Sequence, residues 1–196
     1  MISRRDALKL IEKKVSNKNI IKHMFALEVF MGAIWEELTR KGKTVKDLGG
    51  TKEEWLMVGL LHDGDYCDDV PNEKQGIQIS DWAKEEGYEI PENVSYAMAS
   101  HNFATNVKPI SLMDWSVFIG DSLTGLVVAS ALVLPSRKLS DLTVKSILKK
   151  FKSSSFAKGT RRQDIILCEE KLGLSLDEFI RICLKSMQGI SNDLGL

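Results

Sequence analysis

Residues 55–69 read Trp-Leu-Met-Val-Gly-Leu-Leu-His-Asp-Gly-Asp-Tyr-Cys-Asp-Asp, an apolar run that ends in one histidine and four aspartates. Carboxylates drawn toward an apolar core are normally paired, hydrogen-bonded or bound to a metal. Thr51 and Glu54 form a T-x-x-E capping box that predicts the start of a helix, and Gly64 predicts its end. His62 and Asp63 are therefore expected in the last helical turn, where both can flank one ion beside the helix end.

The composition predicts an intracellular protein whose charges produce no strong net electrostatic field. The chain has 196 residues, enough for one domain with a sizeable core, and its 27 basic and 27 acidic residues cancel. This balance gives no support for binding of duplex nucleic acid or of an anionic membrane. The three cysteines are far apart and odd in number, as in a reduced protein. Residues 1–12 are too charged for a signal peptide, so we expect a cytoplasmic location.

Residues 115–134 are the one segment that needs a membrane check, because their only charge is Asp121 and their length nearly spans a bilayer. An aspartate near the middle of a span is costly in lipid. Six small residues in the same segment suit close packing between helices in a core. We therefore predict a buried central helix at 111–134, begun by the capping pair Ser111 and Asp114, and no membrane contact.

Elsewhere the chain shows helical periodicity only. Apolar residues recur at intervals of three and four, and no stretch alternates for long enough to be a strand. Further helices are expected at residues 3–15, 17–40, 71–87, 91–101, 140–152, 160–172 and 175–188, with a frayed tail after Gly189. The last three are expected to be capped by Ser140, by Thr160 with Gln163, and by Ser175 with Glu178. The pattern predicts an all-α fold, a single-domain helical bundle over residues 1–196.

All three histidines of the chain fall on inward faces of predicted helices. A single inward histidine is most often a hydrogen-bonded core residue. Three of them, with the His62-Asp63 dipeptide and the solitary Asp121, favour a site, and His101 is the third of the group. If the helices that carry His23, His62-Asp63 and Asp121 pack together, two imidazoles and two carboxylates meet. Such a set suits a divalent ion such as Mn²⁺, Fe²⁺, Co²⁺, Ni²⁺ or Zn²⁺.

The order His23, then His62-Asp63, then Asp121 resembles the H…HD…D signature of the HD-domain superfamily of metal-dependent phosphohydrolases. The flanking residues 60–61 and 121–123 are similar to its usual context. The similarity covers residues 17–134, and residues 135–188 resemble the C-terminal helical extension of small bacterial members. The resemblance implies an all-α bundle in which these four residues bind a divalent ion, Mg²⁺ included. It also implies hydrolysis of a phosphate mono- or diester of a small molecule, with a nucleotide favoured.

Two departures from the family pattern narrow what the resemblance implies. Many two-metal members carry an additional histidine in the helix after the HD dipeptide, but residues 72–78 contain none, so one metal is expected rather than two. The alarmone hydrolases of the superfamily carry H-D-x-x-E-D, where residues 62–67 here read His-Asp-Gly-Asp-Tyr-Cys. An alarmone substrate is therefore disfavoured.

The resemblance also suggests a mechanism. A metal held by the four signature residues would bind a phosphate oxygen and acidify a coordinated water. Besides Asp63 itself, the candidates for proton transfer are Asp65, Asp68 and Asp69, for which a solvated acidic loop is the alternative. His101 is a candidate second-metal ligand or phosphate contact. The candidates for neutralising the substrate phosphate are the basic residues Arg137, Lys138, Lys158, Arg161 and Arg162, with Thr160-Arg161-Arg162 best placed at a predicted helix start.

Three classes of function fit the sequence. The first is a phosphohydrolase acting on a small phosphorylated molecule. The second is a catalytically inactive regulatory module that binds metal and ligand, and the third is a plain helical scaffold that binds no metal. The presence of all four signature residues favours the enzyme. A homodimer through residues 3–15 or 111–134 is also compatible with the sequence.

Overall fold

The computed structural model describes residues 1–196 and is entirely helical, which confirms the predicted fold class. The α-helices are α1 (Arg4–Lys14), α2 (Lys18–Arg40), α3 (Val45–Leu48), α4 (Lys52–Leu61), α5 (Gln78–Glu85), α6 (Glu92–His101), α7 (Leu112–Leu132), α8 (Val144–Phe151), α9 (Arg162–Ile165), α10 (Cys168–Leu172), α11 (Leu176–Gln188) and α12 (Ser191–Leu194). Three short 3-10 helices are η1 (Asn72–Lys74), η2 (Phe103–Thr105) and η3 (Leu139–Asp141).

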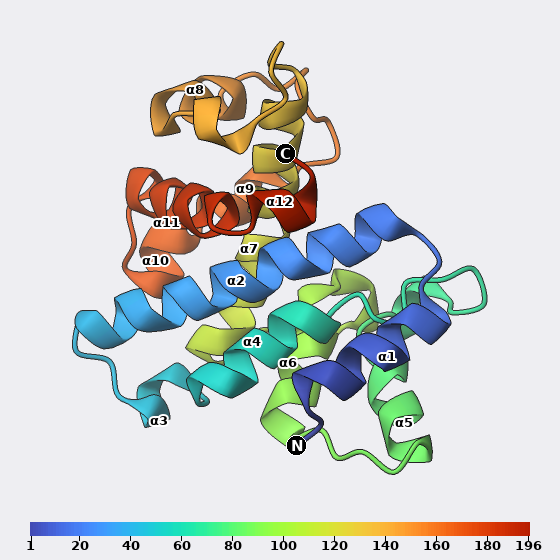
Figure 1. Ribbon diagram of the computed structural model, residues 1–196. Coiled ribbons are helices and arrows are strands. Elements are labelled where there is room, and N and C mark those ends of the chain that lie inside the picture. Colours follow the sequence, from blue (N-terminus) through green and yellow to red (C-terminus); the bar gives the residue numbers. More distant parts are fainter.

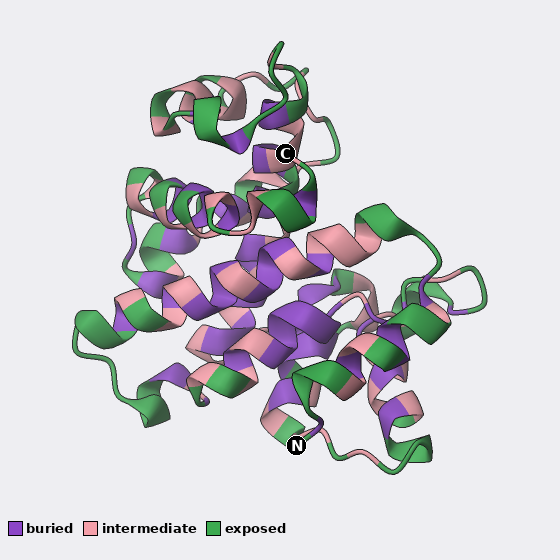
Figure 2. Ribbon diagram, viewed as in Figure 1, coloured by how far each residue is buried: buried purple, intermediate pink, exposed green.

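The long helix α2 runs across the middle of the molecule (Figure 1). Helices α1, α4, α5 and α6 lie on one side of it, and α8 to α12 lie on the other. Helix α7 passes behind α2 and contacts helices of both groups, among them α6, α8 and α11. One apolar core therefore joins both halves, and it extends from Ile2 to Leu194. Buried residues concentrate where α2, α4 and α7 meet (Figure 2).

Helix α7 is the one helix long and apolar enough to cross a membrane by length and composition. It packs against α2, α6, α8, α9, α10 and α11, and 56% of its most apolar stretch is buried. Ser111 and Asp114 form the reciprocal cap that was predicted at its start. The prediction of a buried central helix is confirmed.

The backbones of α2 and α4 touch at Gly59. A Cβ atom added there would lie 2.7 Å from the backbone N and Cα of Glu28 and from the carbonyl oxygen of Leu27. The two helices run in opposite directions (Figure 1). His23 lies about one turn before Leu27 and His62 about one turn after Gly59, so the antiparallel arrangement places both histidines at the same end of the contact.

Two predictions about the segment after α4 are wrong in detail. Helix α4 ends at Leu61, with His62 as its C-cap, so Asp63 lies in the turn that follows rather than in the helix. The helix expected at 71–87 is interrupted, because Gly76 adopts a φ of 90° between η1 and α5. Such a positive φ ends one helical segment before the next begins.

Of the expected caps Ser140 and Ser175, the first needs correction and the second is present. Ser140 lies within the short helix η3, and α8 is capped instead by Thr143 with Ser146. Ser175 does cap α11, since its side chain accepts a hydrogen bond from the backbone N–H of Glu178. Local capping patterns therefore placed one of these two helix starts correctly and one a turn too early.

The other two C-terminal predictions are wrong. Thr160 and Gln163 do not form a capping box, because α9 is a single turn that begins at Arg162 without a side-chain cap. The tail after Gly189 is not frayed, since it forms α12 and buries Leu194 in the core. Helix α12 packs against α2. The local sequence of its four residues does not predict this tertiary contact.

We predict that Gly59→Ala destabilises the protein by about 1–3 kcal/mol, because the added methyl group meets backbone atoms that cannot yield. The free energy of unfolding is measured in urea by far-ultraviolet circular dichroism. Gly125→Ala is the matched control, since it adds the same group to α7 with no atom within 4 Å. The control should gain up to about 1 kcal/mol from helix propensity. A Gly59→Ala variant as stable as wild type would contradict the proposed backbone contact.

Candidate metal centre

Side chains from three parts of the fold meet beside the end of α4. His23 comes from α2, His62 and Asp63 from the end of α4 and its turn, and Asp121 from α7. The Nε2 atoms of His23 and His62 are 3.1 Å apart. Asp63 Oδ2 lies 3.6 Å from the first and 3.4 Å from the second. Asp121 Oδ1 lies 3.0 Å from His23 Nε2.

These separations fit a coordination sphere. Metal–ligand bonds of roughly 2.0–2.2 Å, at angles of roughly 90–110°, place neighbouring ligand atoms roughly 2.8–3.6 Å apart. His23, His62 and Asp63 form a group that could hold a metal ion, with all its donor atoms within 4.8 Å of one another. Asp121 adjoins this group through its contact with His23. The donors are two imidazole nitrogens and carboxylate oxygens, which suit a borderline divalent ion.

Two of the histidines are oriented by backbone carbonyl groups. His62 Nδ1 donates to Gly59 O at 2.9 Å, and His101 Nδ1 donates to Met98 O at 2.6 Å. A proton on Nδ1 leaves the lone pair of a neutral imidazole on Nε2. Each Nε2 then faces the centre, and for His62 this is the atom a metal would bind.

The third histidine is oriented by a side chain. His23 Nδ1 lies 3.3 Å from the hydroxyl oxygen of Thr124, and that hydroxyl donates to the carbonyl oxygen of Asp121 at 2.8 Å. The hydroxyl can therefore accept the Nδ1 proton of His23, which again leaves Nε2 free toward the centre. Thr124 lies three residues after Asp121 on α7, so one turn of helix supplies both the carboxylate and the group that orients the imidazole.

The histidines at the centre keep the two neighbouring carboxyl groups ionised. Burial alone would raise the pKa of the Asp63 carboxyl, but the neighbouring His62 and His101 hold that pKa well below its usual value. Burial likewise opposes ionisation of Asp121, yet the hydrogen bond with His23 lowers the pKa of that carboxyl to about 2. Both carboxylates are therefore ionised at neutral pH, as metal ligands must be.

Two of the imidazoles hold their protons more tightly than usual. Burial would lower the pKa of His23, but Asp121 outweighs it and raises that pKa. The pKa of His101 is raised in the same way, by Asp63, whose Oδ1 lies 3.3 Å from His101 Nε2. Because a metal at His23 must displace a proton, metal affinity should rise with pH.

Two cavities open at the centre, and Arg161 lines both. One, of about 340 Å³, is lined by His23, Asp121 and Lys158. The other, of about 270 Å³, is lined by residues that include Asp63 and His101. Arg161 donates to Asp121 Oδ2 at 3.2 Å and also pairs with Asp164.

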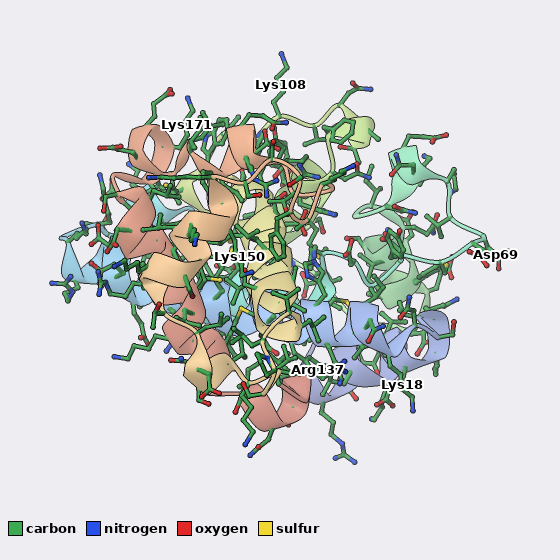
Figure 3. All side chains as sticks on the ribbon, turned by 90° about the horizontal axis from the view of Figure 1, so that it is seen from above. Lys18, Asp69, Lys108, Arg137, Lys150 and Lys171 are labelled. Atoms are coloured by element: carbon green, nitrogen blue, oxygen red, sulfur yellow. The ribbon has the colours of Figure 1, made fainter.

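The candidate acidic residues lie in different environments. Asp65 is fully buried, and its carboxylate accepts hydrogen bonds from the backbone N–H groups of Gly76 at 2.8 Å and Ile79 at 2.9 Å. Burial raises the pKa of Asp65 above its usual value. Asp68 and Asp69 are exposed and line an adjoining groove rather than the two cavities at the centre. Asp69 projects from a loop at the edge of the molecule (Figure 3).

The candidate basic residues also differ in whether they lie at the centre or away from it. Only Lys158 and Arg161 line the cavities at the centre. Arg162 instead donates to backbone carbonyl oxygens, those of Phe151, Ser153 and Phe156 among them, and so ties together the loop before α9. The Arg162 guanidinium is therefore engaged within the protein, and of the expected anion-binding segment 160–162 it is Arg161 that faces the cavities.

Arg137 and Lys138 lie apart from the centre, in the turn after α7. They line a pocket with residues of α12 and the chain end (Figure 3 labels Arg137). Sequence reasoning also missed three residues at the centre, namely Thr124, Tyr66 and Phe103. Thr124 had a usable signal, because it follows Asp121 by one turn on the same face. Tyr66 lies at the end of a turn and Phe103 in a 3-10 helix of three residues, both too short for periodicity to carry information.

Comparison of the chain with known protein families, with curated proteins and with solved structures finds no match. The contacts described above show an all-helical protein with a His-His-Asp group that could bind a metal ion.

We predict that the protein, stripped with a chelator, binds one equivalent of Mn²⁺ or Zn²⁺ in isothermal titration calorimetry. Asp63→Ala should weaken binding by roughly 100-fold or more, because it removes a charged ligand. Asp69→Ala is the control and should bind as wild type does, since its carboxylate is exposed at the periphery. Binding should also weaken as the pH falls from 8 to 6. Equal affinities in the two variants would refute the assignment.

We also predict that Asp65 stabilises the fold. Asp65→Ala leaves the N–H groups of Gly76 and Ile79 without their acceptor and should cost about 2–4 kcal/mol in urea unfolding. Asp65→Asn keeps one acceptor oxygen and should cost less. Asp68→Ala, an exposed neighbour, should stay within about 0.5 kcal/mol of wild type. If Asp65→Ala unfolds at the wild-type urea concentration, its carboxylate does not anchor this segment.

Proposed function

We propose that the protein is a metal-dependent phosphohydrolase of the HD-domain type that cleaves a phosphate ester of a small molecule. The observation that carries the proposal is the contact of His23, His62 and Asp63 with one another, joined by Asp121 through its contact with His23, at distances of 3.0–3.6 Å. Their order in the chain matches the H…HD…D signature, and they reach one another from three separate segments. Bringing charged side chains together in a partly buried place is costly, and a scaffold that binds no ligand gains nothing from it.

The four signature residues would hold the ion. When bound, a divalent metal supplies a Lewis acid for a phosphate oxygen and lowers the pKa of a coordinated water. The guanidinium of Arg161, next to Asp121, provides a fixed positive charge for the other phosphate oxygens. A planar guanidinium suits this task because it can donate two parallel hydrogen bonds to a phosphate.

His101 is the protein group best placed to move a proton. It lines the cavity beside Asp63, its Nδ1 is held by Met98 O, and its Nε2 faces Asp63. Its Nε2, 3.3 Å from Asp63 Oδ1, lies beside the metal ligands, where it could donate a proton to the departing oxygen of the ester. This role replaces the one considered for the loop aspartates, since Asp68 and Asp69 lie outside the cavities.

We predict that the protein, loaded with Mn²⁺, Co²⁺, Ni²⁺ or Mg²⁺, hydrolyses phosphomonoesters or diesters in a screen that includes nucleotides. Asp63→Ala should abolish turnover together with metal binding. His101→Gln should lower kcat by roughly 10²- to 10⁴-fold, because it removes the proton donor, while one equivalent of metal is retained. Asp69→Ala serves as the control with wild-type turnover.

The screen separates the rival functions. Stoichiometric metal without turnover on any ester would favour a regulatory module that binds metal and ligand. No metal at all would leave only a helical scaffold. Turnover that persists in Asp63→Ala would identify a contaminating enzyme.

A further inference from the structure

Two exposed aromatic side chains line the smaller cavity at the metal centre. Tyr66 is 48% exposed and Phe103 is 65% exposed, and both line the cavity that holds Asp63 and His101. Single exposed apolar residues are common on protein surfaces. Two aromatic rings from separate segments at one cavity are a different case, because they offer flat apolar faces beside the reacting groups.

Asn102 fixes the wall that carries Phe103 to the segment that carries Asn72 and Gln75. Its Nδ2 donates to the carbonyl oxygen of Asn72 at 2.6 Å, and its Oδ1 accepts from the backbone N–H of Ala104 at 3.0 Å. Asn102 itself is 9% exposed. The helices η1 and η2 are therefore fixed side by side, and Phe103, the first residue of η2, is placed in advance rather than ordered by a ligand.

Arg161 lines both this cavity and the second one. Its guanidinium lies 5.8 Å from the ring centre of Phe103 and 5.6 Å from that of Phe118, and it pairs with Asp164. The second cavity is lined by His23, Asp121, Lys158 and small residues, and by no phenyl or phenol ring. Tyr66 and Phe103 therefore make the first cavity the one that can stack a flat ring, and Lys158 gives the second a further positive charge.

Polar groups around the aromatic cavity also have unused hydrogen-bonding capacity. The amides of Asn72 and Gln75 line it, and the Nδ2 of Asn72 and the Oε1 of Gln75 make no hydrogen bond within the protein. Amide groups beside a ring-binding surface can pair with the edge of a heteroaromatic ring. At about 270 Å³ the cavity is near the lower end of small-molecule sites, so it fits one ring system.

We propose that the Tyr66–Phe103 cavity binds the organic part of the ester, and that this part carries a planar aromatic or heteroaromatic ring stacked on Phe103. This inference rests on the proposed function, because it takes the phosphate to be bound at the metal and Arg161. The ring then lies on the His101 side of Arg161, and any second charged group lies on the Lys158 side.

The test compares esters that differ only in the ring. kcat/KM is measured for the nucleoside 5′-monophosphates of adenine, guanine, cytosine and uracil and for ribose 5-phosphate, with the metal-loaded chain. Phe103→Ala should lower kcat/KM for the preferred nucleotide by roughly 5- to 150-fold, the range for loss of one stacking contact. It should leave ribose 5-phosphate unchanged, and Phe103→Tyr should restore the wild-type value. Tyr96→Ala, an exposed aromatic residue outside the cavity, is the matched control.

A second measurement does not depend on catalysis. Binding of the four nucleosides to the metal-free chain is followed by calorimetry, and Phe103→Ala should weaken the tightest by the same factor. Nucleoside binding without hydrolysis of any ester would support the ring site and refute the phosphohydrolase. Hydrolysis with no preference for nucleotides over ribose 5-phosphate, or with equal losses on both in Phe103→Ala, would overturn the ring site and leave the phosphohydrolase standing.

Discussion

The contact between the imidazoles of His23 and His62 is the interaction on which the candidate site depends. Their Nε2 atoms are 3.1 Å apart, while both Nδ1 atoms are engaged with oxygen acceptors. Two bare lone pairs at that distance repel, so a proton or a metal ion has to lie between the rings. Asp63 and Asp121 supply the negative charge that makes such a cation favourable. The approach of the two rings is in turn set by the backbone contact at Gly59.

Sequence reasoning found this cluster because each of its signals is local. The Thr51/Glu54 and Ser111/Asp114 capping boxes start the helices that lead to Asp63 and Asp121, and both are present. Periodicity placed His23 on the inward face of α2. The antiparallel packing of α2 on α4 cannot be predicted from any local sequence pattern. The resemblance to the H…HD…D signature supplied the expectation that these helices meet.

The failures occur where a tertiary contact overrides the local pattern. The helix expected at 71–87 breaks because Gly76 takes a positive φ, and its N–H is bound by the Asp65 carboxylate. The expected capping box at Thr160 fails because the loop before α9 is tied together by hydrogen bonds from the Arg162 guanidinium to carbonyl groups of that loop. The tail folds because Leu194 finds a place in the core.

Asp63 and Asp65 show that spacing in the sequence does not by itself predict what a carboxylate contacts. They are two residues apart in one turn, yet Asp63 faces three imidazoles and Asp65 faces backbone N–H groups. Asp65 still serves the site, because the Gly76 that it binds lies against His101. A Cβ at position 76 would come within 3.0 Å of the His101 ring and 2.5 Å of Met98 O, the acceptor of that ring. The acidic loop thus supports the imidazole to which we assign proton transfer in the proposed reaction, and its own buried carboxylate acts through the backbone.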